Sequence, residues 1–319
     1  MKLARLMKYA RVPLEMNGRP GDEVAIITDS NTDPLIGESL VACAYQMDME
    51  PNLVMMLPRA MHGNEPTRLV AAALMAADLS VCPTSMGINH TDAARSAVRS
   101  GKRVLVMPGA TVEMLTEGAA TVDPRELKEV TARVAEALSK ATRIVVTSEK
   151  GTNVTFSLEG RAGLPLDGMI RPGRSAGWPT GEAASAVLES TAEGTIVFDL
   201  SVHSVGLLAE PIRLEVREGR VISIRGGVQA KQFEEVISTK GDSNSLAVGE
   251  FAIGTNAKAR TTGNVTEDKK RLGTIHFALG SNGTLGGKMA SVTHLDGVIS
   301  RATVVADGVV LMDDGKLAI

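Results

Sequence analysis

Val24-Ala25-Ile26-Ile27 is a short apolar run, followed by the polar turn Thr28-Asp29-Ser30-Asn31-Thr32-Asp33 and a helical pattern over residues 34–47. The same rhythm recurs through the first half of the chain. The apolar runs cover residues 24–27, 53–56, 79–82, 104–107 and 144–146. Short buried strands that alternate with helices are typical of a parallel sheet covered by helices. The sequence therefore predicts an α/β fold, with an open, mostly parallel sheet and flanking helices in the N-terminal part.

The clearest helix signal follows Asp123-Pro124, because Asp is a good N-cap residue and Pro suits the first helical turn. Apolar residues recur there every three or four positions, at Leu127, Val130, Val134 and Leu138. Further helices are predicted over residues 34–47, 67–77 and 91–99.

The pattern changes after Lys150-Gly151, where apolar and polar residues alternate with a period of two. The alternating segments are residues 152–158, 212–216 and 221–224. Such alternation indicates antiparallel strands. Residues 163–179 are rich in Gly and Pro and are expected to form a loop. We therefore expect an α/β domain over residues 1–150 and a β-rich α+β metal-binding domain over residues 151–319.

The composition excludes several functions. The chain has 319 residues, with 34 Lys and Arg against 37 Asp and Glu and a formal charge of −3, so nothing favours nucleic-acid binding. It contains neither a Gly-x-Gly-x-x-Gly nor a phosphate-binding P-loop motif, so nucleotide binding is not predicted. Its two cysteines, Cys43 and Cys82, sit in apolar stretches, which suits a reduced protein. No apolar run is long enough for a membrane span, and we expect a cytoplasmic protein without membrane contact.

Five polar residues of the second half are candidate metal ligands. They are Glu182, Glu250, His276, His294 and Asp296. In an extended segment, His294 and Asp296 project from the same face and could grip one cation. Glu250 and His276 each lie in an apolar segment, where a buried polar group without a partner would be costly. Two interpretations stay open: a shared metal site, or a set of separately hydrogen-bonded polar residues.

His90 is a candidate catalytic acid or base. It follows the predicted strand at residues 79–82, at the carboxyl end of the sheet, where open α/β folds place their sites. An imidazole with a pKa of about 6.5 can move a proton near neutral pH. A surface or helix-capping histidine is the alternative interpretation.

The second half resembles the metallo-aminopeptidase family of aminopeptidase T. The resemblance rests on Lys150-Gly151-Thr152-Asn153-Val154-Thr155-Phe156-Ser157-Leu158-Glu159-Gly160-Arg161, Trp178-Pro179-Thr180-Gly181-Glu182, Ala192-Glu193-Gly194-Thr195 and the ligand-bearing segments. It implies two divalent ions, zinc, manganese or cobalt, held by Glu182, Glu250, His276, His294 and Asp296. The catalytic Tyr of that family would fall at Gly283, which departs from the pattern.

The chain is also similar to the family of 2,5-dihydroxypyridine 5,6-dioxygenase, a ring-opening enzyme with one non-haem iron. This similarity rests on Gly286-Gly287-Lys288 through His294-Leu295-Asp296, Trp178-Pro179, Asn89-His90 and Gly101-Lys102-Arg103-Val104-Leu105. It implies a single Fe(II) and an acid or base role for His90. In that family the first iron-binding His falls at Glu250, and an apolar residue replaces His276.

The two resemblances imply different reactions. Five ligands with three carboxylates suit two ions that activate a water for hydrolysis, so we expect a metal-dependent hydrolase of a small amide, cyclic amide or short peptide. The alternative is an iron dioxygenase that opens a dihydroxypyridine-like ring, with His276, His294 and Asp296 as the two-His-one-carboxylate face. In either case the substrate is a small molecule, and a homodimer is expected because the relatives form dimers.

Overall fold

A computed structural model describes residues 2–319, and its contacts divide them into two units. The first unit contains residues 2–121 and returns to include Asp167–Thr180, and the second contains Val122–Leu166 and Gly181–Ile319. This division differs from the boundary expected near residue 150. The helix that begins after Asp123 and the strand at residues 143–148 both belong to the second unit.

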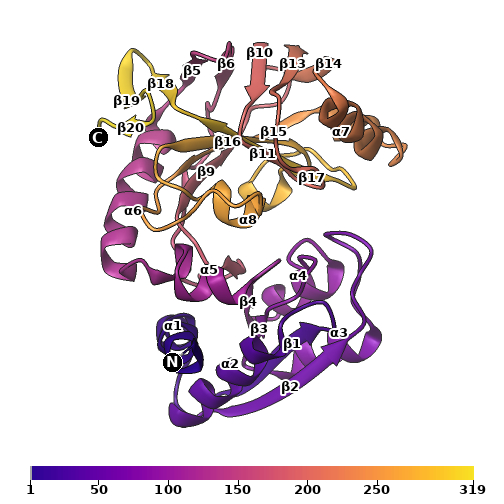
Figure 1. Ribbon diagram of the computed structural model, residues 1–319, viewed down its shortest axis with the longest axis vertical. Coiled ribbons are helices and arrows are strands. Elements are labelled where there is room, and N and C mark those ends of the chain that lie inside the picture. The colour runs from indigo at the N-terminus through magenta and orange to yellow at the C-terminus, as the bar shows by residue number, and fades with distance from the viewer. Residues whose placement is uncertain (1) are drawn as a thin grey trace. The chain divides into compact units, whose positions relative to one another are not determined.

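The first unit is built on a five-stranded sheet with the order β2-β1-β3-β4-β8, in which all neighbours are parallel (Figure 1). Its strands are β1 (Glu23–Asp29), β2 (Glu50–Met56), β3 (Leu79–Cys82), β4 (Arg103–Val106) and β8 (Ala176–Gly177). Its helices are α1 (Lys2–Asn17), α2 (Pro34–Gln46), α3 (Arg68–Ala76), α4 (Asp92–Arg99) and α5 (Val112–Thr116), followed by the 3₁₀ turn η1 (Ala119–Thr121).

Helices cover both faces of this sheet because successive strand residues point in opposite directions. Val24 and Ile26 of β1 pack with α1, α2 and α5 on one face. Ala25 and Ile27 pack with α3 and α4 on the other face. The predicted α/β class, with a parallel sheet and flanking helices, is confirmed.

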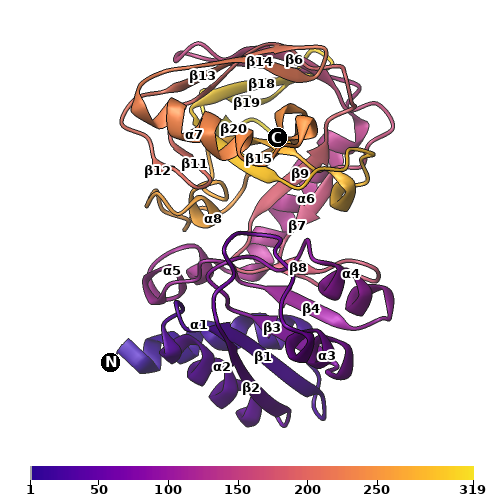
Figure 2. The same ribbon diagram turned by 90° about the vertical axis from the view of Figure 1, so that its right-hand side faces the viewer.

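The second unit consists of two antiparallel sheets (Figure 2). The eight-stranded sheet has the order β14-β13-β10-β6-β5-β18-β19-β20, and the seven-stranded sheet has the order β12-β11-β17-β16-β15-β9-β7. The strands of the first are β5 (Arg143–Ser148), β6 (Asn153–Ser157), β10 (Glu193–Phe198), β13 (Ile212–Arg217), β14 (Arg220–Arg225), β18 (Ala302–Ala306), β19 (Val309–Asp313) and β20 (Lys316–Leu317). Those of the second are β7 (Leu164–Leu166), β9 (Glu182–Ala186), β11 (Ser201–Val202), β12 (Gly206–Leu207), β15 (Val248–Gly254), β16 (Thr274–Gly280) and β17 (His294–Ser300).

One apolar core joins the two sheets of this unit. It includes Phe156 of β6 together with Phe251 of β15 and Phe277 of β16, whose ring centroids are 5.0 to 5.4 Å apart. The helices of the unit are α6 (Pro124–Lys140), α7 (Val228–Ser238) and α8 (Val265–Asp268), with 3₁₀ turns η2 (Ser243–Leu246) and η3 (Gly283–Leu285). The predicted cap of α6 is confirmed, because the Asp123 carboxylate accepts a hydrogen bond from Arg125 N.

Two expectations about strands were wrong. The run at residues 144–146 was expected in the parallel sheet, but β5 pairs antiparallel with β6 and β18 in the second unit. The periodicity of a short apolar run does not reveal which sheet it joins, and the turn at residues 149–152 brings β6 back beside β5. The fifth parallel strand is instead β8, which lies with β7 in the segment expected to be a loop.

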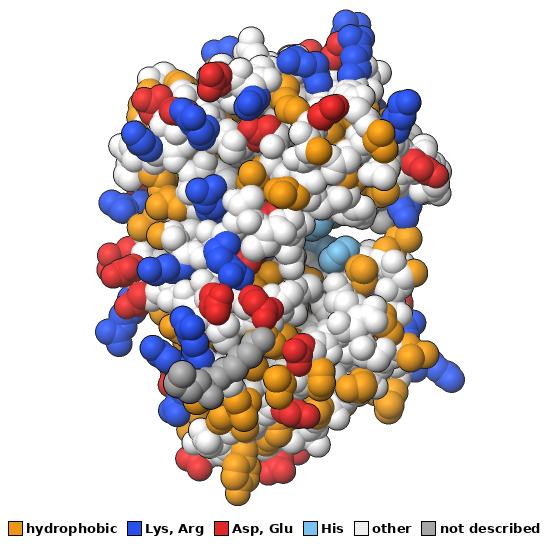
Figure 3. Space-filling model, viewed as in Figure 1, with side chains coloured by type: hydrophobic (Ala, Val, Ile, Leu, Met, Phe, Trp, Pro, Cys, Tyr) orange, Lys and Arg blue, Asp and Glu red, His pale blue; other side chains and the backbone are white. Residues whose placement is uncertain are grey.

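Three further features of the described residues concern helix length, the cysteines and the surface charge. No helix among them is both long and apolar enough to cross a membrane. Cys43 and Cys82 are buried and unbridged. Burial raises the pKa of the Cys82 thiol to about 12. Acidic and basic side chains are interspersed on the face seen in Figure 3.

Candidate metal centre

The candidate ligands stand on one face of the seven-stranded sheet. In β15, Phe251 and Ile253 point into the core, so Glu250, which directly precedes Phe251, points to the opposite face. The register extends that face across the neighbouring strands, since Glu250 lies opposite Ala278 of β16, which lies opposite Asp296 of β17. The same face of the sheet also carries His276 on β16, Glu182 on β9 and His294 on β17.

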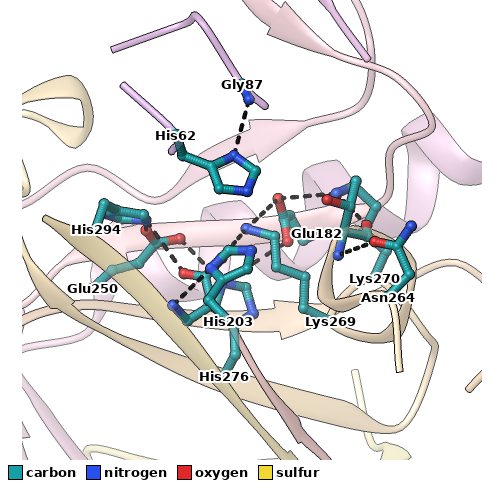
Figure 4. A network of polar contacts seen from close by, with 12 residues as sticks. His62, Gly87, Glu182, His203, Glu250, Asn264, Lys269, Lys270, His276 and His294 are labelled. Carbon is teal, nitrogen blue, oxygen red and sulfur yellow. Dashed lines mark hydrogen bonds and ion pairs between the residues drawn. The ribbon is translucent and has the colours of Figure 1, made fainter. Parts of the chain in front are cut away.

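Three of the candidates converge closely. Glu250, His294 and Asp296 each offer one ligand atom, and these atoms lie within 4.8 Å of one another. The Nε2 atom of His294 is 3.0 Å from Glu250 Oε2, as Figure 4 shows for these two side chains, and 3.3 Å from Asp296 Oδ1. Ligand atoms around one ion at about 2.1 Å are themselves about 3 Å apart, so this triad has the dimensions of one face of a metal site.

The backbone fixes the tautomer of His294. Its Nδ1 atom lies 2.8 Å from the Ser281 carbonyl oxygen, which can only accept, so Nδ1 carries a proton and donates it. When the ring is neutral, Nε2 then keeps its lone pair, which a cation held by the two carboxylates could accept. A hydrogen bond of this kind orients metal-binding imidazoles in many proteins.

His276 and Glu182 lie beside the triad. His276 is fully buried, and its Nε2 atom is 3.2 Å from Glu250 Oε1 and 3.9 Å from Glu182 Oε2. The short contact gives His276 a role in holding the Glu250 carboxylate. Glu182 lies far from the other candidates in the sequence. It reaches the cluster because β9 pairs with β15, where Glu182 lies opposite Gly254.

Two lysines at the C-terminal end of α8 enter the cluster, since Lys269 is the C-cap residue of that helix and Lys270 follows it. The Lys269 ammonium is 2.9 Å from Asp296 Oδ2 and 3.5 Å from Glu182 Oε1. The Lys270 ammonium donates to Thr266 O at 2.7 Å and is 3.9 Å from Glu182 Oε1. Figure 4 shows both side chains reaching toward Glu182.

The charged groups of the cluster shift one another's pKa values. Burial alone would raise the pKa of Glu250, but hydrogen bonds from His276 and His294 outweigh it and hold the pKa well below its usual range. Burial also opposes ionisation of Asp296, yet Lys269, His203 and His294 lower its pKa strongly. The two acceptor carboxylates conversely raise the pKa of His294 above its usual value despite its burial. The cluster therefore favours ionised carboxylates and a cation beside them.

Three buried polar atoms of the cluster lack a hydrogen-bond partner, which suits the binding of a cation. Among the described residues, Glu182 Oε2, Asp296 Oδ1 and His276 Nδ1 are buried and form no hydrogen bond. Buried polar atoms are normally paired, and exceptions often mark an ion that belongs there. Carboxylate oxygens and an imidazole nitrogen are suitable ligands for zinc, manganese, cobalt or iron. The residues present thus fit a divalent metal ion.

Other residues near the cluster were not identified from the sequence. His203, which follows β11, accepts a hydrogen bond on Nδ1 from the Asp296 backbone N–H at 3.0 Å. Lys269 and Lys270 belong to the charged run Glu267-Asp268-Lys269-Lys270-Arg271, and such a run is typical of a solvent-exposed surface. Four of its residues, 267–270, are in fact largely buried, which only the packing of α8 against β17 reveals.

His90 lies on the turn between β3 and α4 in the first unit, and its carbonyl oxygen accepts a hydrogen bond from Arg95 Nη1 at 2.6 Å. Its proposed acid or base role stays a prediction. Gly283, where the aminopeptidase resemblance would require a Tyr, begins the turn η3, and a Cβ atom built there would meet nothing within 4 Å.

Comparisons with known proteins support both resemblances. The sequence profile of the 2,5-dihydroxypyridine 5,6-dioxygenase family matches residues 6–319. The chain is 27% identical over 261 residues to 2,5-dihydroxypyridine 5,6-dioxygenase from Pseudomonas putida, covering 76% of this chain and 72% of the relative. The solved structure of a 2,5-dihydroxypyridine dioxygenase from that organism has a TM-score of 0.84 at 22% identity, covering 99% of this chain and 97% of the other. Aminopeptidase T from Thermus thermophilus has a TM-score of 0.73 at 15% identity and covers 99% of both chains, which shows a shared fold.

Proposed function

Because the chain belongs to the 2,5-dihydroxypyridine 5,6-dioxygenase family, we propose that it is a non-haem iron dioxygenase that opens a hydroxylated nitrogen heterocycle. The observation that carries this proposal is the triad Glu250, His294 and Asp296, whose ligand atoms lie within 4.8 Å of one another. The hydrolase expected from the ligand set has weaker support, because aminopeptidase T is only 15% identical to this chain and that likeness shows a shared fold alone.

The proposed iron ligands differ from those first considered. The expected face was His276, His294 and Asp296, but His276 lies against Glu250 Oε1 at 3.2 Å and is better suited to orient that carboxylate. We therefore assign the face to one imidazole and two carboxylates. An Fe(II) ion bound there would supply the redox chemistry for inserting dioxygen across a ring bond.

The protein's own groups would prepare this site. The Ser281 carbonyl fixes the His294 tautomer, and the His276 ring holds one oxygen of Glu250. The Lys269 ammonium neutralises one oxygen of Asp296 and so reduces the negative charge that an anionic substrate would meet. His90 remains our proposed acid or base for the hydroxyl proton, and a homodimer remains our proposed assembly.

The decisive experiment is oxygen consumption by the Fe(II)-loaded protein with 2,5-dihydroxypyridine. We expect ring absorbance and dissolved oxygen to fall together, with about one O₂ consumed per ring, and no turnover without oxygen. A protein with Asp296→Asn should lose this activity while keeping its circular dichroism spectrum, because a metal ligand is removed.

The same assay separates the hydrolase alternative. If turnover of an amide or cyclic amide continues unchanged under strict anaerobiosis with zinc, manganese or cobalt, the protein is a metallohydrolase and the dioxygenase proposal is wrong.

A further inference from the structure

Asp296 offers its two carboxylate oxygens to two different cation positions. Its Oδ1 atom faces His294 Nε2 at 3.3 Å, within the triad proposed to hold the metal. Its Oδ2 atom faces the Lys269 ammonium at 2.9 Å. A carboxylate that bridges two positive centres is also the arrangement of two-metal sites, where the ions lie about 3.5 to 4 Å apart.

The second position has the ligands of a metal site but holds an ammonium group. Lys269 Nζ lies between Asp296 Oδ2 and Glu182 Oε1, at 2.9 and 3.5 Å. Only 14% of the Lys269 side chain is exposed and 6% of that of Glu182, so little water competes for these contacts. Lys270 adds a second ammonium, 3.9 Å from the same Glu182 oxygen.

The net charge of the cluster also favours one divalent ion over two. Three buried carboxylates, Glu182, Glu250 and Asp296, carry three negative charges, and two lysines bring two positive charges to them. One divalent ion then leaves the cluster with a single excess positive charge. A second ion would raise this excess to three charges in a poorly hydrated place, which is electrostatically unfavourable.

We propose that Lys269 and Lys270 replace the second divalent ion, so that this cluster of five ligand-type residues holds one metal ion. This inference rests on the proposed metal site. It gives Glu182 a role, because a carboxylate that contacts no ion in a one-metal enzyme would otherwise be surplus.

The test counts ions in the intact protein. The metal-free chain is loaded with excess Mn²⁺ without oxygen and desalted, and the bound manganese is measured by elemental analysis and by electron paramagnetic resonance. We expect one ion per wild-type chain with the signal of an isolated Mn²⁺. Lys269→Ala, which removes both the charge and the bulk, should bind about two ions whose signals are coupled.

Two further variants serve as controls. Lys269→Arg keeps the charge and should bind one ion, as should Lys128→Ala, which removes an exposed lysine from α6. Lys269→Ser replaces Lys269→Ala if the alanine variant fails to fold. A purely structural role for Lys269 would lower the melting temperature of the variants without changing the number of ions.

The outcomes separate this inference from the proposed function. Two coupled ions in the wild type, or one ion in a folded Lys269→Ala protein, would overturn the role of the lysines even if ring opening occurs. One ion per wild-type chain and two in Lys269→Ala would support that role even if dihydroxypyridine is not opened. A wild-type chain that binds no ion would overturn both.

Discussion

At the scale of single residues, the candidate site depends on which atom of each side chain faces the cluster. His294 is suited to bind a metal because the Ser281 carbonyl accepts from Nδ1–H and leaves Nε2 directed at Glu250 and Asp296. His276 has the same chemistry but a different neighbour, since its Nε2 atom faces the Glu250 carboxylate. Identical residue types therefore take different roles on the same face of one sheet.

Replacement of His276 by Leu should weaken metal binding without abolishing it. The variant loses the contact that holds Glu250, and loss of such outer partners costs about 10- to 100-fold in metal affinity. Titration of the metal-free protein with Mn²⁺ by calorimetry measures the change. The control is Ile275→Val on the opposite face of β16, which should cost about 0.5–1.5 kcal/mol of stability and leave the affinity unchanged. Equal affinity in both variants would argue against a supporting role for His276.

At the scale of elements, the connection between β16 and β17 positions the start of β17. The Glu189 carboxylate accepts hydrogen bonds from Lys288 N at 2.8 Å and Asn282 Nδ2 at 3.1 Å, and it pairs with Arg161. Arg161 also donates to Gly286 O at 2.7 Å. Both ends of the turn η3 are thus tied to one carboxylate, a few residues before His294.

The stability of this connection should depend on pH. Burial works against ionisation of Glu189, but the hydrogen bonds from Lys288 and Asn282 and the charge of Arg161 hold its pKa below the usual range. A lowered pKa in the folded state contributes stability above the unfolded-state pKa of about 4.3, and this contribution is lost as the pH falls through the folded-state value.

Glu189→Gln should therefore lower the free energy of unfolding near pH 7, and the gap to the wild type should narrow below about pH 4. Urea unfolding at a series of pH values measures the gap. Glu234→Gln, at an exposed position of α7, should track the wild type throughout. A gap for Glu189→Gln that stays constant with pH would contradict this account of its pKa.

At the scale of the whole molecule, the candidate residues are distributed over both units. His90 lies on the turn after β3 in the first unit, whereas all five candidate metal residues belong to the second unit. Three of the strands that present them, β15, β16 and β17, are neighbours in the seven-stranded sheet, and the core joins that sheet to the eight-stranded one.

Removal of the metal should therefore loosen the second unit selectively. A ligand present at 100 times its dissociation constant stabilises the state that binds it by about 2.7 kcal/mol. We expect chelation to speed hydrogen exchange at amides of β15, β16 and β17 and to leave β1 and β3 unchanged, as measured by mass spectrometry. Equal acceleration in both units would show that they unfold as one cooperative body.

The sequence by itself determined the α/β class, the helices that follow Asp33, Thr67, Thr91 and Asp123, and the apolar segments that carry Glu250 and His276. These features depend on neighbouring residues in the chain: caps, apolar spacing and turn residues act locally. Glu250 and His276 were identified because polar residues inside apolar segments are costly unless they share a partner. The resemblance to the aminopeptidase family, and not the spacing, implied that all five candidate residues form one ligand set.

Only the tertiary structure decided which strands pair, and therefore what each candidate residue contacts. The register across β15, β16 and β17 brings Glu250 and Asp296 together, and α8 carries Lys269 into the cluster. The sequence around Lys269 looks like a solvated charge run, because burial of a lysine depends on what packs over it. Pairing of distant segments decides such contacts, and local sequence patterns do not encode it.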